Sequence, residues 1–338
     1  MVLGEVAGLV AAMSYSIQSH LVSSIVTKSS PMLVCLIRNT ISMILSFLVM
    51  LIFSQNVFPD ADLKLYGYLI ISGISGVTLA DALYLYTLYY LGARKAILLE
   101  TLAPPFTGLI SYFYLDSTLS LIGWIGVSLT IYGIYIVVNA EYSQKKGQNK
   151  LDLPILQQNQ QYLEDQVKNE MELNNFQQIQ SNNNCQQIKE QSINSKLYMG
   201  LSFGIAANFC QALGMVLSHD AMISGYFDSI NSTFIRLAAG ILCIVIIVKI
   251  KGQNIIWPIK SQQDNRIFFI SILIGPIIGI WSQQFSLIYT RPEVVQTLLA
   301  TTPVFGLFIS KYKGEEMKLE YYIGSFIAVL GVAIIIWF

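Results

Sequence analysis

The sequence predicts an all-α, polytopic membrane protein of ten transmembrane helices, arranged as two inverted five-helix repeats. Three observations support this prediction. Only 12% of the 338 residues are charged while 54% are hydrophobic, which leaves too few polar residues to cover a soluble core of this size. The hydrophobic residues lie in blocks about as long as a bilayer is thick. The two halves of the chain also carry the same uncommon residues in the same order.

Ten apolar blocks are each close to the roughly 20 residues that a helix needs to cross hydrocarbon. Six of them contain no Asp, Glu, Lys or Arg: 6–26, 119–140, 197–218, 267–290, 294–310 and 321–338. Four more contain a single ion: 32–54 with Arg38, 65–91 with Asp81, 96–115 with Glu100 and 229–248 with Arg236. The blocks are too long for strands and do not alternate strictly, so we expect ten helices.

An offset of 198 residues superimposes the two halves. It pairs five uncommon residues in order: Arg38 with Arg236, Pro105 with Pro303, Gly108 with Gly306, Gly126 with Gly324, and Gly133 with Gly331. The first-helix and third-helix regions align less cleanly. Because each copy holds an odd number of spans, the second copy must enter the membrane upside down. This is the plan of many secondary transporters, whose site lies between the repeats near the midplane.

The distribution of basic residues agrees with inverted copies. Sixteen lysines and arginines fall in the linker and in the loops on its side, whereas only Lys64 and Arg291 fall on the opposite side. By the positive-inside rule we expect the linker to be cytosolic and both termini to lie across the membrane. Which cellular membrane the protein occupies is left open.

The chain divides into a first repeat at 1–140, a linker at 141–196 and a second repeat at 197–338. Twenty-two of the 56 linker residues are Gln or Asn. Such a segment has too little apolar surface to offset the entropy of ordering it. We therefore expect a disordered linker, with helical content in part of it as an alternative.

Composition argues against several classes of function. The net charge is zero, so no basic surface suggests nucleic acid as a partner. With only two histidines and no C-x-x-C pair, we expect neither a metal site nor a cofactor. Nucleophile-elbow and histidine-rich metalloenzyme motifs are also missing, so we do not expect an enzyme.

Residues 89–138, which include GARKAILLETLAPP, resemble the second half of an EamA domain, the repeat unit of the drug/metabolite transporter superfamily. The features that carry the resemblance are the Gly-Ala-Arg-x-Ala helix entry, an intramembrane proline and a last helix with spaced glycines. Residues 275–333 are similar to the same unit, including the Gly-Glu pair at Gly314 and Glu315. The resemblance implies ten helices, a central cavity between the repeats and transport of a small organic solute.

Two acids lie inside predicted spans, where an ionised carboxylate costs at least about 2.5–3.5 kcal/mol and therefore faces a cavity or a partner. Glu100 shares a helix face with Pro104, and Asp81 has Tyr84 one turn along its face. Asp81 resembles an acidic position of some bacterial-type EamA proteins. The alternatives are substrate or proton coupling and a structural pairing, for Glu100 with Arg38. Under the 198 offset neither acid is duplicated, so we expect coupling in the first copy and neutral hydrogen bonds in the second.

Arg38 and Arg236 recur in both copies, which favours a shared structural role, with an anion site as the alternative. Pro104, Pro105 and Pro303 are expected to free backbone carbonyls, those of Glu100, Thr101 and Leu299 among them, that then need another donor. Neutral polar groups on the helices flanking the expected cavity complete the site candidates, although each one alone is more often an interhelical hydrogen bond: Thr101, Asn208, Gln211, Trp281, Gln284, Gln296 and Thr301.

The sequence thus favours a secondary transporter of a small organic solute, with a coupled proton or counter-solute, that works by alternating access as a monomer or homodimer in contact with lipid. The alternatives are a cation or divalent-metal transporter or channel, which would need acids ringing a pore, and a membrane scaffold without transport. The identity of the solute is not encoded in any motif.

Overall fold

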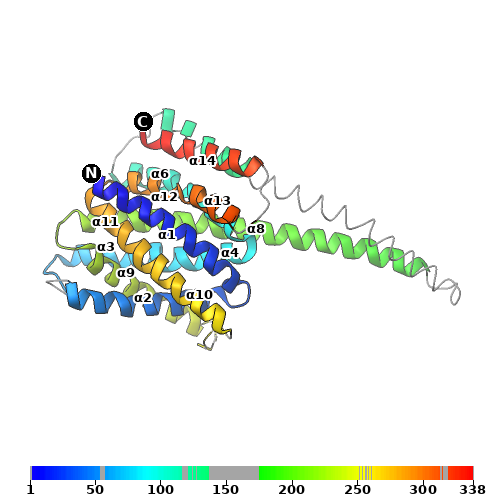
Figure 1. The fold of residues 1–338 in the computed structure, drawn as a ribbon, viewed down its shortest axis with the longest axis horizontal. Helices are drawn as coiled ribbons and strands as arrows, with labels where there is room; N and C mark the ends of the chain where they lie inside the picture. Colours follow the sequence, from blue (N-terminus) through cyan, green and yellow to red (C-terminus); the bar gives the residue numbers. More distant parts are fainter. Residues whose placement is uncertain are drawn as a thin grey trace.

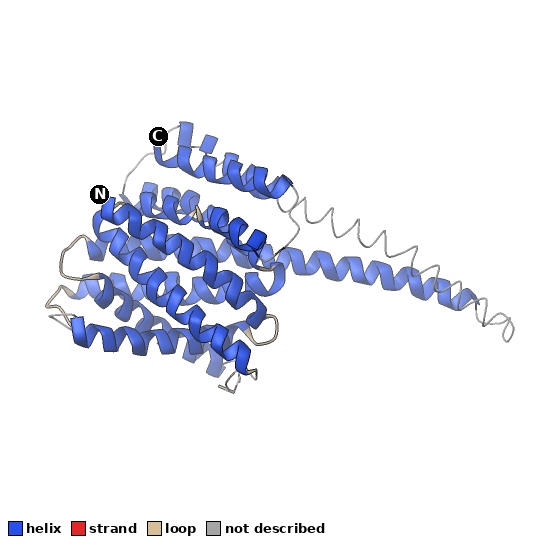
Figure 2. Ribbon diagram, in the orientation of Figure 1, coloured by secondary structure: helices blue, strands red, loops and turns tan. Residues whose placement is uncertain are grey.

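The computed structural model describes residues 2–53, 58–115, 121–136 except 124 and 127, 175–250, 252, 254, 255, 257, 259, 261–312, 314 and 319–337. Every regular element in these ranges is a helix, joined by short loops (Figure 2). Eight helical stretches are long and apolar enough to cross a membrane, and shorter apolar helices lie at Leu121–Ile136 and Leu319–Gly331. Together they account for the ten predicted spans, and the protein is polytopic as the sequence predicted.

The first repeat begins with two unbroken spans, and its third and fourth spans each contain an irregular turn. Its elements are α1 (Val2–Val26), α2 (Pro31–Phe53), α3 (Leu63–Ser72), the π-helical η1 (Gly73–Leu79), α4 (Ala80–Leu91), α5 (Ala93–Leu99), the 3₁₀-helical η2 (Glu100–Leu102), α6 (Ala103–Leu115) and the helix at 121–136. The π turn continues α3 into α4, so Leu63–Leu91 forms one span.

The second repeat follows the same plan. Its elements are α8 (Asn175–Met222), α9 (Ser229–Ile250), α10 (Gln262–Ile272), the π-helical η3 (Leu273–Gly279), α11 (Ile280–Tyr289), α12 (Pro292–Leu299), α13 (Thr302–Tyr312) and α14 (Leu319–Trp337). The π segments of the two repeats begin 200 residues apart, at Gly73 and Leu273. The register in this span is therefore two residues longer than the 198 offset, and Asp81 corresponds to Trp281 instead of lying near Gly279.

The two repeats run in opposite directions through the bundle. In Figure 1, α1 starts at the end of the bundle where both termini lie, whereas α8 enters from the opposite end. The repeats also exchange their first helices. The α1 helix packs against η3, α11, α12 and α13 of the second repeat, and α8 packs against α3, η1, α4 and α6 of the first. This exchange places the seam between the repeats along the middle of the molecule.

Glycines that defined the sequence repeat also join its last helices. A Cβ on Gly133 would collide with the backbone of Gly324 and Ala328, and one on Gly331 would collide with Gly126 and Thr130. The helix at 121–136 therefore crosses α14 at backbone contact, with the Thr130 hydroxyl 3.5 Å from the Ala328 carbonyl. Small residues allow this approach in lipid, where close packing replaces the hydrophobic effect as a source of helix association.

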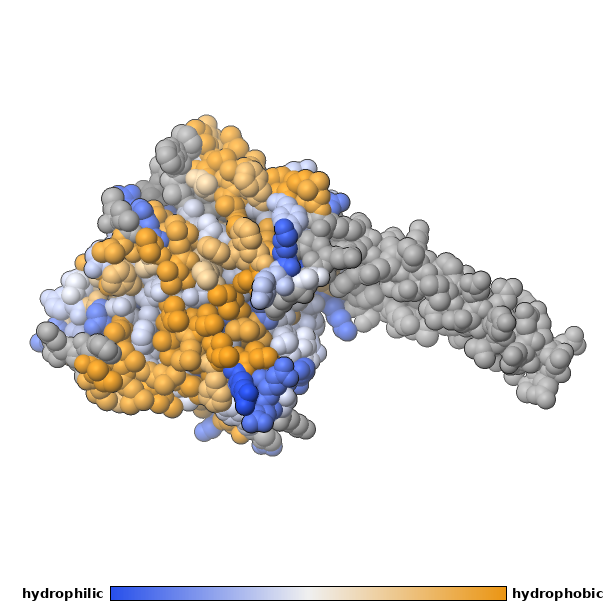
Figure 3. Space-filling view, in the orientation of Figure 1, coloured by the Kyte–Doolittle hydropathy of each residue, from blue (hydrophilic) through white to orange (hydrophobic). Residues whose placement is uncertain are grey.

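The outer surface is apolar over much of the bundle, as expected for a lipid-facing surface (Figure 3). Large side chains such as Leu48, Ile71 and Leu242 are half or more exposed. In water such a surface would cause aggregation, but in a bilayer it is the matched solvent. The protein is thus an integral, multi-pass membrane protein.

The structure differs from the expected linker over its last part. Residues 175–196 are helical and continue without a break into the span that ends at Met222. Gln is nearly as good a helix former as Lys or Glu, and a helix that is already anchored in a span can be extended without a new nucleation step. Residues 141–174 lie outside the described residues.

Membrane orientation stays a prediction and can be tested with a tag after Phe338. The charge bias predicts that protease added to right-side-out cells or vesicles removes this tag. A site engineered at 157–160 in the linker should be cut only after the membrane is permeabilised. A protected C-terminal tag, together with a linker that is cut from outside, would contradict this orientation.

Candidate functional site

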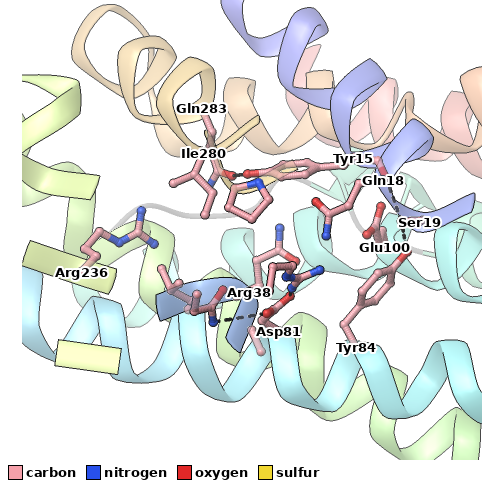
Figure 4. A pocket seen from close by; sticks show the side chains of 16 residues that line it. Tyr15, Gln18, Ser19, Arg38, Asp81, Tyr84, Glu100, Arg236, Ile280 and Gln283 are labelled. Atoms are coloured by element: carbon pink, nitrogen blue, oxygen red, sulfur yellow. Dashed lines mark hydrogen bonds and ion pairs between the residues drawn. The ribbon is translucent and has the colours of Figure 1, made fainter. Parts of the chain in front are cut away.

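A polar cavity lies on the seam between the two repeats (Figure 4). The volume open to water-sized molecules is about 90 Å³. Both repeats line it: Tyr15, Gln18, Ser19, Arg38, Asn39, Gly76, Val77, Ala80, Asp81, Tyr84 and Glu100 belong to the first, and Gln211, Arg236, Pro276, Ile280 and Gln283 to the second. Four ionisable side chains of opposite sign thus meet inside a bundle whose outer surface is apolar.

The irregular turns of the broken spans lie against the exchanged helices at this cavity. A Cβ on Gly76 in η1 would come within 2.8 Å of the Gly214 Cα of α8, and a Cβ on Gly73 would collide with the backbone of Arg236. In the other repeat, a Cβ on Gly279 in η3 would lie 2.7 Å from the Tyr15 ring of α1. Helix π turns change the backbone hydrogen-bond register and often mark functional sites. Here they bring backbone close to backbone and direct side chains of α1, α4 and α9 into the cavity.

Arg38 and Asp81 form an ion pair on one wall of the cavity. The arginine is 1% exposed and the aspartate 18%. Asp81 also accepts from the Cys35 thiol at 3.2 Å and from the Asn39 amide at 3.4 Å. Three donors of α2 therefore hold this carboxylate, and its charge is compensated inside the bundle.

Glu100 lies at the 3₁₀ turn between α5 and α6, on another part of the wall (Figure 4). Its carboxyl is hydrogen-bonded to the Tyr84 hydroxyl, which in turn lies 2.8 Å from the Ser19 hydroxyl. Among the described residues no lysine or arginine forms an ion pair with Glu100. The alternative that Glu100 pairs with Arg38 is therefore wrong, because Asp81 occupies that arginine.

The Ser19–Tyr84 contact has a counterpart in the second repeat. Ser218 of α8 is hydrogen-bonded to Gln284 of α11, with 2.9 Å between the amide nitrogen and the hydroxyl. Ser218 lies 199 residues after Ser19, and Gln284 lies 200 after Tyr84. The repeat therefore extends to the first and third spans, where sequence alone aligned it least well.

Tyr15 crosses the cavity from α1 and donates a hydrogen bond to Gln283 of α11. Its hydroxyl lies within electrostatic reach of all four ionisable side chains of the cavity, Arg38, Asp81, Glu100 and Arg236. This central position makes Tyr15 a candidate contact for anything bound there. Sequence reasoning did not select Tyr15, Gln18, Ser19 or Asn39, although the 15, 18, 19 spacing places three polar groups on one face of a charge-free span.

Arg236 enters the cavity from α9 without a counter-ion. It is 2% exposed, and its Nε and Nη1 atoms have no hydrogen-bond partner. In the described part of the chain neither of the two ion pairs includes it. The expectation that the second copy supplies only neutral groups is therefore wrong, since it supplies a buried cation.

Seven neutral candidates from the sequence do not all reach the cavity. Gln211 lines it. The others are absent from the lining, and most are occupied by partners of their own: Thr101 with the Leu98 carbonyl, Asn208 with Gly204, Trp281 with Ser46, Gln284 with Ser218 and Thr301 with Leu298. Gln296 is buried away from it. They fit the alternative of interhelical or intrahelical hydrogen bonds.

The prolines do not free all the carbonyls expected of them. Pro104 and Pro105 lie in the first turn of α6, where a proline is tolerated, and the Ala103 amide donates to the Glu100 carbonyl. Next to Pro303, the Thr302 hydroxyl donates to the Leu299 carbonyl at 2.5 Å. None of the three prolines lines the central cavity; Pro303 lines a smaller pocket near His20. Their structural part is to begin a helix after a tight turn.

Comparison with known proteins agrees with this architecture. The model of the EamA-like transporter family matches residues 2–139 and 198–337. An uncharacterized protein of Methanocaldococcus jannaschii is 28% identical over 130 residues, which are 38% of this chain but 92% of that protein, so the relative is about as long as one repeat. A protein of known crystal structure matches 99% of this chain and 97% of its own with a TM-score of 0.62 and 13% identity, which shows the fold alone. With two complete matches that cover most of its length, the chain belongs to the EamA-like transporter family.

Proposed function

We propose that this protein is a secondary transporter that moves a small organic solute across its membrane by alternating access. The observation that supports the proposal best is the cavity on the seam of two inverted repeats, lined by ionisable and amide groups from both. Inverted-repeat carriers bind their solutes at such a seam, beside discontinuous helices, and expose it alternately by moving one repeat against the other.

The geometry also assigns separate roles to the two acids. Asp81 is neutralised by Arg38 and orients that arginine on the wall. Glu100 has only hydroxyl partners, so its proton can exchange with water or solute when the cavity opens. We therefore assign proton coupling to Glu100 and a positioning role to Asp81. The described residues contain no group of three or more His, Cys, Asp or Glu side chains able to hold a metal ion, which gives the divalent-cation alternative no specific support.

Transport itself is tested with the purified full-length protein in proteoliposomes. Vesicles are incubated with a defined mixture of amino acids, sugars, organic acids and nucleotides, and their contents are measured by mass spectrometry. A carrier should accumulate one class with saturable kinetics and should exchange it when preloaded. Non-saturable flux would indicate a channel, and no uptake above protein-free vesicles would contradict the proposal.

Replacing Glu100 with glutamine is expected to abolish accumulation driven by a pH gradient. One pH unit supplies about 1.4 kcal/mol per proton, which supports up to about tenfold accumulation of a singly coupled solute. The amide keeps the size of the side chain but carries no exchangeable proton charge. The variant should therefore equilibrate the solute without concentrating it, as measured by uptake at several external pH values.

Glu293→Gln is the matched control, because Glu293 lies in the first turn of α12 and not in the cavity. It should accumulate solute as the unmodified protein does. Asp81→Asn should retain a response to pH while lowering stability through the loss of the Arg38 pair. Proton-driven accumulation that persists in Glu100→Gln would remove Glu100 from the coupling role.

A further inference from the structure

The two repeats treat their equivalent arginines differently. Arg38 of α2 has Asp81 as its counter-ion, one span further along the first repeat. The π segments align Asp81 with Trp281, and the Trp281 indole nitrogen instead lies 3.3 Å from the Ser46 hydroxyl. The second repeat therefore keeps the arginine but has no carboxylate at the position that would pair with it.

A cation left in this way needs an anion or water to replace its hydration. Arg236 is 2% exposed, and its Nε and Nη1 have no hydrogen-bond partner. Its guanidinium extends toward the cavity from the side opposite Glu100 and Tyr84 (Figure 4). A buried polar group without a partner is unfavourable in any protein, and a charge at membrane depth more so. Such a group is retained where a ligand completes it.

We propose that Arg236 binds the carboxylate of a small, singly charged organic acid, and that such acids are the solute class of this carrier. The inference rests on the proposed transport function and specifies its substrate. A planar guanidinium presents parallel N–H donors that match both oxygens of a carboxylate. Gln211, Gln283 and Tyr15 line the same cavity and can hydrogen-bond the remainder of the molecule.

The charges around the cavity favour a monoanion. Arg38 is already neutralised by Asp81, so Arg236 is the one cavity cation without an acid partner among the described residues. A phosphate monoester carries close to two negative charges at neutral pH, and its second charge would lack a partner here while Glu100 contributes another acid. The volume open to water, about 90 Å³, also favours a short acid in this conformation.

Binding to the purified protein in detergent tests the inference separately from transport. The probes are acetate and lactate, their neutral analogues acetamide and lactamide, and glycerol 3-phosphate, all at equal ionic strength. Acetate or lactate should bind saturably and raise the melting temperature, whereas the two amides should not. Arg236→Gln should weaken acid binding about tenfold to a hundredfold, the range for losing a charge-assisted hydrogen bond, and Arg236→Lys should retain part of it.

Arg291→Gln is the control, because it removes an exposed arginine at the start of α12 and should bind acids normally. Melting without ligand reports whether each variant is folded, and a structural arginine would lose stability on replacement. The inference falls if amides bind as well as acids, if Arg236→Gln binds acids normally, or if glycerol 3-phosphate binds more tightly than both acids. Uptake of a neutral solute without acid binding would overturn this inference alone, while acid binding without any uptake would overturn the transport function alone.

Discussion

Methionine in place of Arg38 is expected to lower the free energy of unfolding by about 3–5 kcal/mol, the usual effect of removing one member of a buried ion pair. Asp81 would then remain in the bundle with only Cys35 and Asn39 as donors. The same substitution at Arg236 is expected to act in the opposite direction. It removes a buried charge that has no counter-ion, and it should raise the stability of the solute-free protein by about 1 kcal/mol or more.

Thermal unfolding of both variants in one detergent measures this difference. The two sites are matched, since both arginines lie at equivalent positions of their repeats and both are buried. The double variant Arg38→Met, Asp81→Leu should recover part of the lost stability, because neither charge is then left alone. Equal destabilisation by Arg38→Met and Arg236→Met would show that Arg236 has a structural partner, and it would count against the proposed anion site.

Leucine in place of Gly214 is expected to prevent correct assembly of the two repeats. A Cβ at this position would lie 2.7 Å from the Gly76 nitrogen and 3.0 Å from the Ser72 carbonyl oxygen, and both are backbone atoms that no rotamer change can move. The Ser72 hydroxyl also donates to the Gly214 carbonyl at 2.5 Å. Overpacking in a core typically costs about 1–3 kcal/mol, and a clash between two backbones should exceed that range.

Size-exclusion chromatography and melting temperature measure the outcome. Gly67→Leu is the control in the same bundle, because a Cβ at Gly67 meets no atom within 4 Å. It should remain monodisperse and keep its melting temperature. A Gly214→Leu protein that is as stable as the control would mean that α8 and η1 do not meet at this point.

Several features of the architecture could be predicted from residue order alone. Ten apolar blocks predict ten spans because bilayer thickness sets helix length. The order Arg, Pro, Gly, Gly, Gly repeated after 198 residues predicts two copies, and the odd number of spans in each predicts their inversion. Here the lipid imposes strict limits on length and polarity, and a pattern that meets those limits has few alternative folds.

Prediction of the cavity succeeded for ionised groups and failed for most neutral ones. Asp81, Glu100, Arg38 and Arg236 all line it, because a charge in a membrane span has almost no other place to be. Trp281, Gln284 and Asn208 are polar as well, yet they hydrogen-bond other helices or their own. A neutral polar group can be satisfied at any helix contact, so its residue type alone does not place it.

The sequence by itself determined the class of the protein, the number and inversion of its spans and the four charges inside them. Only the tertiary structure decided which charges neutralise each other. The pairing of Arg38 with Asp81, and the absence of an acid beside Arg236, depend on π turns that shift the register of two spans by two residues. Such a pairing is a matter of a few ångströms between distant segments, and local sequence patterns carry no information at that scale.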